Sequence, residues 1–137
     1  MRKSSGIKIV PQKKDYDCGI AAMAMLLGIT YGDVSAVVRA LYGSTKPNKR
    51  GIMLYHMEEI ASQLDTPLKR VYKAKSYLSG KTGILGMNGG NMDSAGHWVV
   101  LKDGDTILDP DDGAVYKLYD YLEENKCRPA TLLIKDI

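Results

Sequence analysis

The sequence predicts an α+β protein in which helices come first and antiparallel strands follow. Up to Pro67 the apolar residues have helical spacing, or fill a whole segment, and the segments end at glycines. After Pro67 they fall into short runs rich in β-branched residues, which are typical of strands. The 137 residues, 45% of them hydrophobic, are enough for one domain over residues 1–137 that needs no disulfide or metal to hold it together. We therefore expect a single domain whose sheet packs on the first helix.

Three helices are expected in the first half of the chain, over about residues 18–28, 34–42 and 53–64. The first begins near Asp17, which can cap it, and ends at Gly28, which suits the left-handed position after a helix. Because residues 20–27 are apolar on every side, this helix should be the buried central one. Asp33 is the expected cap of the second helix.

Short strands are expected in the second half, over residues 68–72, 83–87, 97–101, 106–108 and 131–134, with one more helix at about 117–125. Before the first helix, residues 7–10 form a short β-branched piece ended by Pro11. Proline cannot donate a hydrogen bond inside a sheet, so this piece suits an edge strand or an extended arm.

The clearest hairpin lies on either side of residues 103–105, because Asp-Gly is a strong turn signal. A three-residue loop would pair Leu101 with Ile107 and place His97 and Asp109 on the same face, which is otherwise apolar. The two polar residues would then lie diagonally across the strands, within reach of each other. We expect this face to turn toward the first helix.

Cys18 stands at the start of that helix, so Cys18, His97 and Asp109 could act as nucleophile, base and orienting residue. Each also has a structural explanation: an inert buried thiol, a core histidine and a turn aspartate. A metal site with these three ligands is a further alternative, although no two of them have the close spacing of a zinc site. Cys127 and His56 are expected to be structural or surface residues.

At this point the sequence resembles the double-glycine leader peptidases, papain-like cysteine peptidase domains found at the N-terminus of bacteriocin exporters and as stand-alone proteins. The resemblance extends over about residues 10–122 and rests on Gln12 with five residues before Cys18-Gly19, on the segment from Gly96 to Leu101, and on Asp109-Pro110 with Gly113. It implies a papain-like fold in which the nucleophile helix packs on the C-terminal antiparallel sheet. It also implies that Cys18 is the nucleophile, His97 the general base and acid, Asp109 the residue that orients the imidazole, and Gln12 the side-chain donor of an oxyanion hole.

The function predicted is that of a cysteine peptidase that cleaves a peptide or protein substrate, such as a leader or precursor peptide, without a metal or organic cofactor. The chemistry of the residues agrees, because the positive end of a helix dipole favours a thiolate. Two alternatives stay open: an amidase, isopeptidase or acyltransferase on the same scaffold, and a module that binds a peptide without cutting it.

Charge and hydropathy narrow the expected partners. The net charge of +3 comes from scattered lysines, which argues against nucleic-acid binding. The longest apolar run, residues 20–29, is about half of the ~20 residues that span a bilayer, and the basic N-terminus lacks the apolar region of a signal peptide. We expect a cytoplasmic protein without a membrane span of its own, and a membrane exporter stays open as a partner. Residues 43–51 and 86–96, which include Gly89-Gly90, are predicted to be loops that border the cleft. The sequence gives neither the oligomeric state nor the substrate.

Overall fold

Helices fill most of the first half of the chain and strands most of the second, as the α+β prediction requires. The computed structural model describes residues 7–11, 13, 17–47, 52–71, 78–88 and 97–136. Within these residues the helices are α1 (Cys18–Leu27), α2 (Tyr31–Tyr42), α3 (Leu54–Gln63) and α4 (Leu118–Asn125). The strands are β1 (Leu68–Val71), β2 (Gly83–Asn88), β3 (His97–Lys102), β4 (Thr106–Asp109), β5 (Ala114–Lys117) and β6 (Arg128–Lys135).

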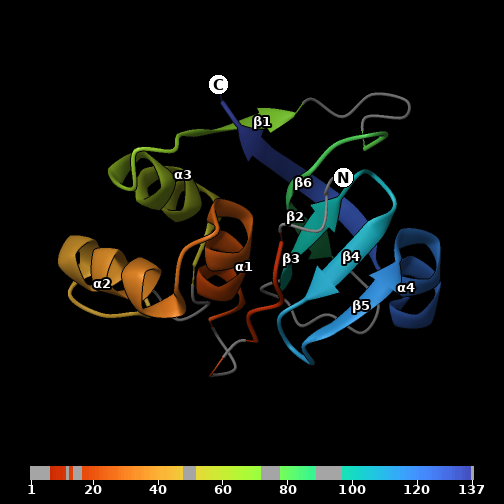
Figure 1. Ribbon diagram of the computed structural model, residues 1–137, viewed down its shortest axis with the longest axis horizontal. Coiled ribbons are helices and arrows are strands. Elements are labelled where there is room, and N and C mark those ends of the chain that lie inside the picture. The colour runs from red at the N-terminus through yellow and green to blue at the C-terminus, as the bar shows by residue number, and fades with distance from the viewer. Residues whose placement is uncertain are drawn as a thin grey trace.

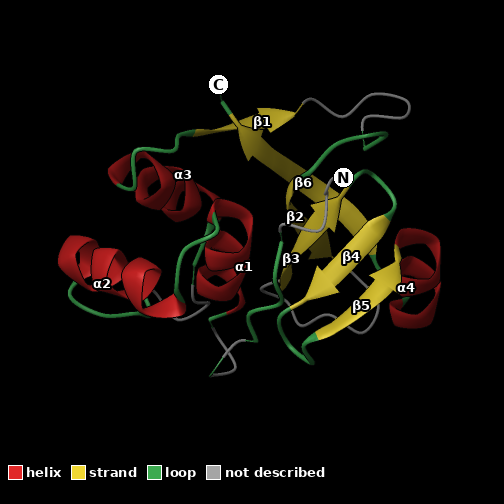
Figure 2. Cartoon of the chain, viewed as in Figure 1, coloured by secondary structure: helices red, strands yellow, loops and turns green. Residues whose placement is uncertain are grey.

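The strands form one sheet in the order β1-β6-β2-β3-β4-β5, and every neighbouring pair is antiparallel. The last strand, β6, is therefore inserted between β1 and β2. Figure 1 shows α1, α2 and α3 grouped on one side of the sheet and α4 on the other. The secondary-structure colouring makes the same separation visible, with three helices at one end of the molecule and α4 at the opposite end (Figure 2).

Each face of the sheet has its own hydrophobic core. The first core joins α1, α2 and α3 to side chains that include Val100 and Leu108. The second core lies on the opposite face and includes Val99, Leu101 and Ile107 together with residues of α4 and β6. Neighbouring residues of β3 therefore alternate between the two cores, because side chains of a strand point to opposite faces in turn.

The central helix α1 is as buried as its sequence predicts, since every residue from Gly19 to Leu26 is buried. It ends at Gly28, which has the left-handed backbone (φ 70°) and donates its N–H to the carbonyl of Ala24. The expected cap is wrong in one respect. Asp17 occupies the position before the helix, but its side chain makes no capping hydrogen bond. Its carboxylate instead accepts hydrogen bonds from the N–H of Lys13 and the hydroxyl of Tyr31.

The structure differs from or sharpens the sequence predictions at three further places. Helix α2 begins one turn earlier than expected, because Thr30 caps it and Asp33 returns the hydrogen bond as the partner in a capping box. Of the two forms expected for residues 7–10, an edge strand or an extended arm, the structure shows no strand; their apolar side chains are partly buried against the first core without sheet pairing. Strand β5 was not predicted from the sequence at all, and its pairing with β4 makes it an edge of the sheet.

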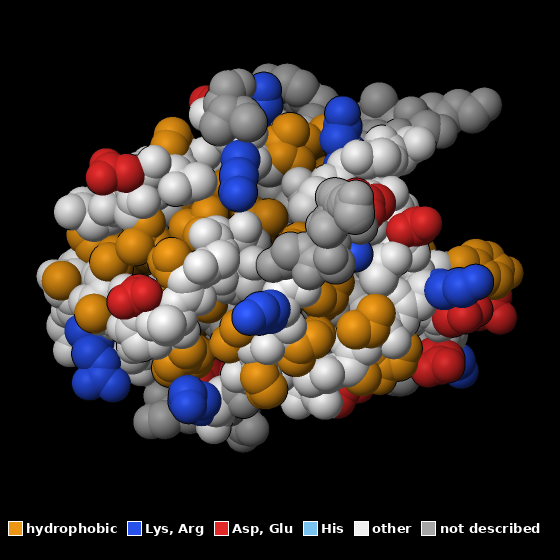
Figure 3. Space-filling model, viewed as in Figure 1, with side chains coloured by type: hydrophobic (Ala, Val, Ile, Leu, Met, Phe, Trp, Pro, Cys, Tyr) orange, Lys and Arg blue, Asp and Glu red, His pale blue; other side chains and the backbone are white. Residues whose placement is uncertain are grey.

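Lysine and arginine side chains are interspersed with acidic ones over the face of the molecule drawn in Figure 3. Apolar side chains lie between them in several small groups. The exposed large apolar residues include Tyr55, Val115 and Tyr119, which belong to three different elements. In the part of the chain that the structure describes, no helix combines the length and the apolar character needed to cross a bilayer.

Candidate active site

Cys18 is the first residue of α1 and lies at the end of the helix that meets the start of β3. The backbone N–H of Trp98 donates a hydrogen bond to its sulfur, with an N–S distance of 3.4 Å. Cys18 is a free thiol and is only partly buried. The buried α1 thus holds a partly buried sulfur against the backbone of the sheet.

Trp98 braces this junction between helix and sheet. Its indole N–H donates to the carbonyl of Ile52 over 2.8 Å. Its ring lies so close to α1 that a Cβ added at Gly19 would come within 3.2 Å of it. A Cβ added at Gly86 of β2 would approach the same ring to 3.0 Å. Glycines on both sides therefore allow the tryptophan to sit between α1 and the sheet.

His97 and Asp109 meet across the β3–β4 hairpin. The hairpin has the predicted three-residue loop, since Leu101 pairs with Ile107. His97 opens β3 and Asp109 closes β4, and the distance from His97 Nε2 to Asp109 Oδ1 is 2.6 Å. Because an ionised carboxylate can only accept, Nε2 carries the proton in this contact and Nδ1 is left for the cysteine.

Two further donors hold the Asp109 carboxylate. The backbone N–H of Asp111 donates to Oδ1 at 2.9 Å, and the hydroxyl of Tyr121 donates to Oδ2 at 2.8 Å. Both oxygens are therefore engaged. The exposed fraction of Asp109 is only 6%, so these bonds are made largely out of water, where they are electrostatically stronger.

The electrostatics of His97 and Asp109 favour an ion pair. Burial by itself disfavours a charged ring, but hydrogen bonds and charge interactions with Asp109 and with the Cys18 sulfur outweigh it and raise the pKa of His97 to about 10. Burial would likewise raise the pKa of Asp109, yet the bonds from His97, Asp111 and Tyr121 hold that pKa below its ordinary value. The ring is thus a proton carrier with a carboxylate on one side and a thiol on the other.

One expectation about this cluster is wrong. The face of β3 and β4 that bears His97, Val99 and Ile107 does not turn toward α1; it packs in the second core, against α4. Helix α1 covers the opposite face, where Trp98 and Val100 point. Cys18 and His97 meet nevertheless, because His97 is the first residue of β3 and α1 begins at that end of the strand.

Gln12, the predicted oxyanion donor, lies outside the described residues, as do residues 48–51 and 89–96 of the two loops expected to border the cleft, Gly89-Gly90 included. Residues 86–88, expected in the second loop, belong to strand β2. The chain on either side of Gln12 is described. Pro11 lies close to Gly113 in the turn between β4 and β5, and the N–H of Lys13 donates to Asp17, the residue before Cys18.

The remaining two candidates are placed in the structure as structural residues. His56 is buried in α3, where its Nδ1 accepts the N–H of Met53 at the start of that helix, and burial lowers its pKa. Cys127 is a free, buried thiol of the second core, and burial raises its pKa.

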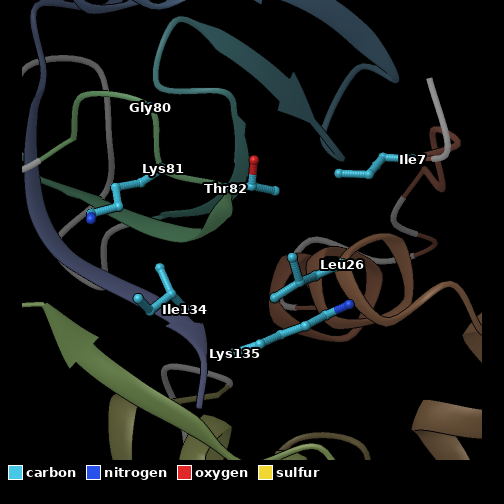
Figure 4. Close-up of a pocket in the computed structure, with 7 residues that line it drawn as sticks. All are labelled: Ile7, Leu26, Gly80, Lys81, Thr82, Ile134 and Lys135. Carbon is cyan, nitrogen blue, oxygen red and sulfur yellow. The ribbon is translucent and has the colours of Figure 1, made fainter. Parts of the chain in front are cut away.

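A pocket of about 390 Å³ lies at the other end of α1 from Cys18. Figure 4 shows the apolar side chains of Ile7, Leu26 and Ile134 bordering it, together with the segment from Gly80 to Thr82. Leu26 lies eight positions after Cys18 in α1, or about 12 Å along the helix axis, and Cys18 does not line this pocket. Among the described residues no three His, Cys, Asp or Glu side chains are grouped so that they could hold a metal ion.

Comparison with models of protein families identifies the family of this chain. The model of the peptidase C39 family matches residues 6–125, which is most of the chain. The chain belongs to the peptidase C39 family. It is therefore a cysteine peptidase, a hydrolase, and the resemblance to the double-glycine leader peptidases is confirmed.

Solved structures agree on the fold. The peptidase domain of Streptococcus ComA, a bi-functional ABC transporter involved in a quorum sensing pathway, superposes with a TM-score of 0.68 at 18% identity, over 94% of this chain and 97% of that one. A double glycine motif protease from an AMS/PCAT transporter, solved in complex with the leader peptide, gives 0.67 at 18% identity, over 96% and 92%. At such identity the likeness establishes the fold. The comparison with curated proteins gave no match.

Sequence reasoning missed Tyr121 and Trp98 as parts of this region. Both lie inside elements that were predicted, but nothing in a helical or alternating pattern says that a tyrosine hydroxyl or a strand N–H will face a particular side chain. The available signal for Tyr121 was weak: a large polar-tipped aromatic at the buried position of an amphipathic helix, where the hydroxyl needs a partner.

Proposed function

We propose that this cysteine peptidase cleaves a peptide bond with Cys18 as nucleophile, His97 as general base and acid, and Asp109 as the residue that orients the imidazole. The observation that carries the proposal is the position of His97, which bonds to Asp109 over 2.6 Å and interacts with the Cys18 sulfur. Gln12 and the backbone N–H of Cys18 are the proposed donors to the oxyanion. The described neighbours of Gln12 support this role, since Lys13 is tied to the residue that precedes Cys18.

The reaction follows from these positions. The Cys18 thiolate attacks the carbonyl carbon of the scissile bond, and the oxygen takes the negative charge that Gln12 and the helix N-terminus would stabilise. The His97 imidazolium gives its proton to the leaving nitrogen, the C–N bond breaks, and a thioester remains on Cys18. Neutral His97 then takes a proton from water, which attacks the thioester, and the C–S bond breaks to release the acid.

The substrate that we propose is a leader or precursor peptide. Family membership supports it, as does the similarity to a double glycine motif protease that was solved in complex with the leader peptide. Cleavage after a pair of glycines would suit a narrow cleft, because glycine lets the backbone approach the nucleophile closely. A membrane exporter that takes up the processed peptide would then be the natural partner, with the peptidase acting on the cytoplasmic side of the membrane.

The first test is the rate at which iodoacetamide alkylates Cys18 as a function of pH, in the wild type and in His97→Ala. Peptide mass spectrometry separates Cys18 from Cys127 without a further substitution. We expect rapid alkylation well below the ordinary thiol pKa of ~8.5 in the wild type and its loss in His97→Ala. Slow alkylation that needs alkaline pH in both proteins would contradict the proposed pair.

A second test addresses the reaction. A synthetic peptide with a leader sequence, a Gly-Gly pair and several residues after the pair should be cut by the wild type and left intact by Cys18→Ala, with both proteins binding it. If both bind it and neither cuts it, the chain is a peptide-binding module. If only non-peptide amides, or acyl transfer to an amine, are turned over, the amidase or acyltransferase alternative replaces peptide cleavage.

A further inference from the structure

We infer that Tyr121 is a positioning residue for the proposed reaction: its hydroxyl fixes the Asp109 carboxylate in the orientation that keeps His97 directed at Cys18. The inference rests on the proposed function, because it gives Tyr121 a role only through Asp109 and His97. It extends the site across the sheet to α4, whose Tyr121 packs in the second core, on the face of the sheet opposite α1.

The burial of Tyr121 makes its hydroxyl informative. The residue is 1% exposed, and its ring packs in the second core with Val99 and Ile107. It meets the ring of Tyr116 edge-on, with 5.3 Å between centroids. A phenylalanine would fill the same space, whereas a buried hydroxyl costs free energy unless it finds a partner. The partner is Oδ2 of Asp109, at 2.8 Å.

The carboxylate gains orientation from this bond. Rotation of an aspartate carboxylate about its last side-chain bond is broad and roughly two-fold, so one anchored oxygen leaves it free to tilt. Oδ1 accepts from His97 and from the backbone of Asp111, and Oδ2 accepts from Tyr121. The hydroxyl thus supplies the second fixed point of the carboxylate, from an element unrelated to the β3–β4 hairpin.

The hydroxyl of Tyr121 keeps its proton throughout the pH range in which the protein would be assayed. Burial and the neighbouring Asp109 charge raise the pKa of Tyr121 well above its ordinary value, so it remains a donor. The same hydrogen bond is one of the interactions that hold the pKa of Asp109 low. Its removal should therefore raise the pKa of Asp109 and move the acid limb of the activity profile to higher pH.

Tyr121→Phe tests the inference, with Tyr116→Phe as its matched control. Tyr116 belongs to the same aromatic pair, and its hydroxyl also donates to a carboxylate, that of Asp112, whose other oxygen accepts from the N–H of Ala114. We expect Tyr121→Phe to lower both kcat and the rate of Cys18 alkylation near pH 6 about tenfold. This is the lower end of the loss in activity, about 10- to 100-fold, that follows when the hydrogen-bond partners of metal-binding histidines and carboxylates are mutated. KM should stay unchanged and the acid limb should shift upward, while Tyr116→Phe should match the wild type.

A double-mutant cycle separates positioning from folding. In an Asp109→Asn background Tyr121→Phe should have no further effect on alkylation, because the residue through which it acts is gone. 4-Aminophenylalanine at position 121 keeps a hydrogen-bond donor in place, so it should restore the pH profile of alkylation. The same variant tests the inference if Tyr121→Phe folds poorly. Equal effects in both backgrounds, or a lower Tm with an unchanged pH profile, would overturn the inference.

The outcomes also distinguish this inference from the proposed function. If His97→Ala and Asp109→Asn leave Cys18 alkylation unchanged, the proposed triad itself fails. If those two variants lower the rate and Tyr121→Phe does not, the triad stands and only the role of Tyr121 is wrong.

Discussion

Two buried aspartates, Asp17 and Asp109, lie beside the two halves of the proposed site, and each accepts a hydrogen bond from a tyrosine hydroxyl. Asp17 is 0% exposed, precedes Cys18 and is bonded by Tyr31 and by the N–H of Lys13. Asp109 is 6% exposed and is bonded by Tyr121 and by the N–H of Asp111, but it also holds His97. The two carboxylates are alike in burial and in their tyrosine, and they differ in what else they touch.

Because of this difference, we expect the two carboxylates to have different roles. Asp17 joins the segment that enters α1 to the start of α2, so it fixes where the helix carrying Cys18 begins. Asp109 contacts a ring that would change its protonation state during the reaction. Disturbing the first should therefore lower the stability of the fold, whereas disturbing the second should change rates and their pH dependence.

The largest effect is expected for Asp109→Asn. An amide can donate to Nε2, which would place the imidazole proton on the side of Cys18 and remove the charge that stabilises the imidazolium. We expect kcat for peptide cleavage to fall between about 100-fold and about 10⁴-fold, the upper figure being that of a serine triad, with KM little changed.

Asp112→Asn is the matched control, because Asp112 lies in the same turn and accepts from Ala114 and Tyr116 rather than from His97. Steady-state kinetics on one peptide substrate compares the two. A loss of similar size in both variants would mean that the turn, and not the contact with His97, determines the rate.

The pH dependence gives the second prediction. The pKa of His97 is raised to about 10 in the folded protein, so the stabilisation from its bond to Asp109 is complete below the unfolded value of ~6.5 and is lost as pH rises toward 10. The pKa of Asp109 is lowered, so the same stabilisation is also lost as pH falls through the acid range. Urea unfolding of the wild type and Asp109→Asn should therefore differ most between about pH 4.5 and 6.5 and converge at both extremes. A difference that is constant with pH would show that the pair is not charged.

Sequence patterns predicted those features of this site that depend on residues within one hairpin, and not those that depend on how the hairpin packs. The turn at 103–105 fixed the register of β3 and β4, and the register alone brought His97 to Asp109. The choice of face could not be made, because both faces of the hairpin are apolar: Val99 and Leu101 point to one core and Val100 to the other. Strand β5 escaped prediction for a related reason, since its four residues are alternately half-buried and exposed and include the outward-facing Val115.

At Asp17 the sequence predicted the position of the residue correctly but not the partner of its side chain. An aspartate before an apolar helix predicts a cap, and the helix does begin there, yet the side chain bonds to Tyr31, fourteen residues away. Capping is a local tendency worth about 1 kcal/mol, and a buried tertiary hydrogen bond to a charged group is worth as much or more. Tertiary contacts therefore redirected a side chain whose position along the chain had been predicted correctly.

Tyr31→Phe is the counterpart of Tyr121→Phe and should have the contrasting outcome. It removes the hydroxyl that Asp17 accepts from, and we expect the free energy of unfolding to fall by about 1 to 3 kcal/mol, as for a hydrogen bond to a charged group. The shape of the pH–rate profile should stay that of the wild type. Chemical denaturation and the alkylation profile of Cys18 measure the two quantities separately. A shifted profile with unchanged stability would reverse the roles assigned to the two aspartates.

The smallest effect is expected from Gly19→Ala, which probes how tightly α1 is seated beside Cys18. A methyl group there would meet Met57 Sδ at 3.1 Å, Trp98 Cδ1 at 3.2 Å and Ile52 Cβ at 3.3 Å. Alanine favours a helix over glycine by about 1 kcal/mol, but overpacking typically costs about 1 to 3 kcal/mol, so a net loss of about 1 kcal/mol is expected.

Gly32 is the second residue of α2, as Gly19 is of α1, and a methyl group at Gly32 would find its nearest neighbour at 3.7 Å. Gly32→Ala should therefore raise the Tm slightly where Gly19→Ala lowers it, which differential scanning calorimetry can measure. Gly19→Ala should also slow Cys18 alkylation, because the methyl group pushes on Trp98, whose N–H bonds to the sulfur. Equal Tm changes in the two variants would mean that the packing between α1 and Trp98 accommodates a methyl group. Close packing would then not be what holds Cys18 in place.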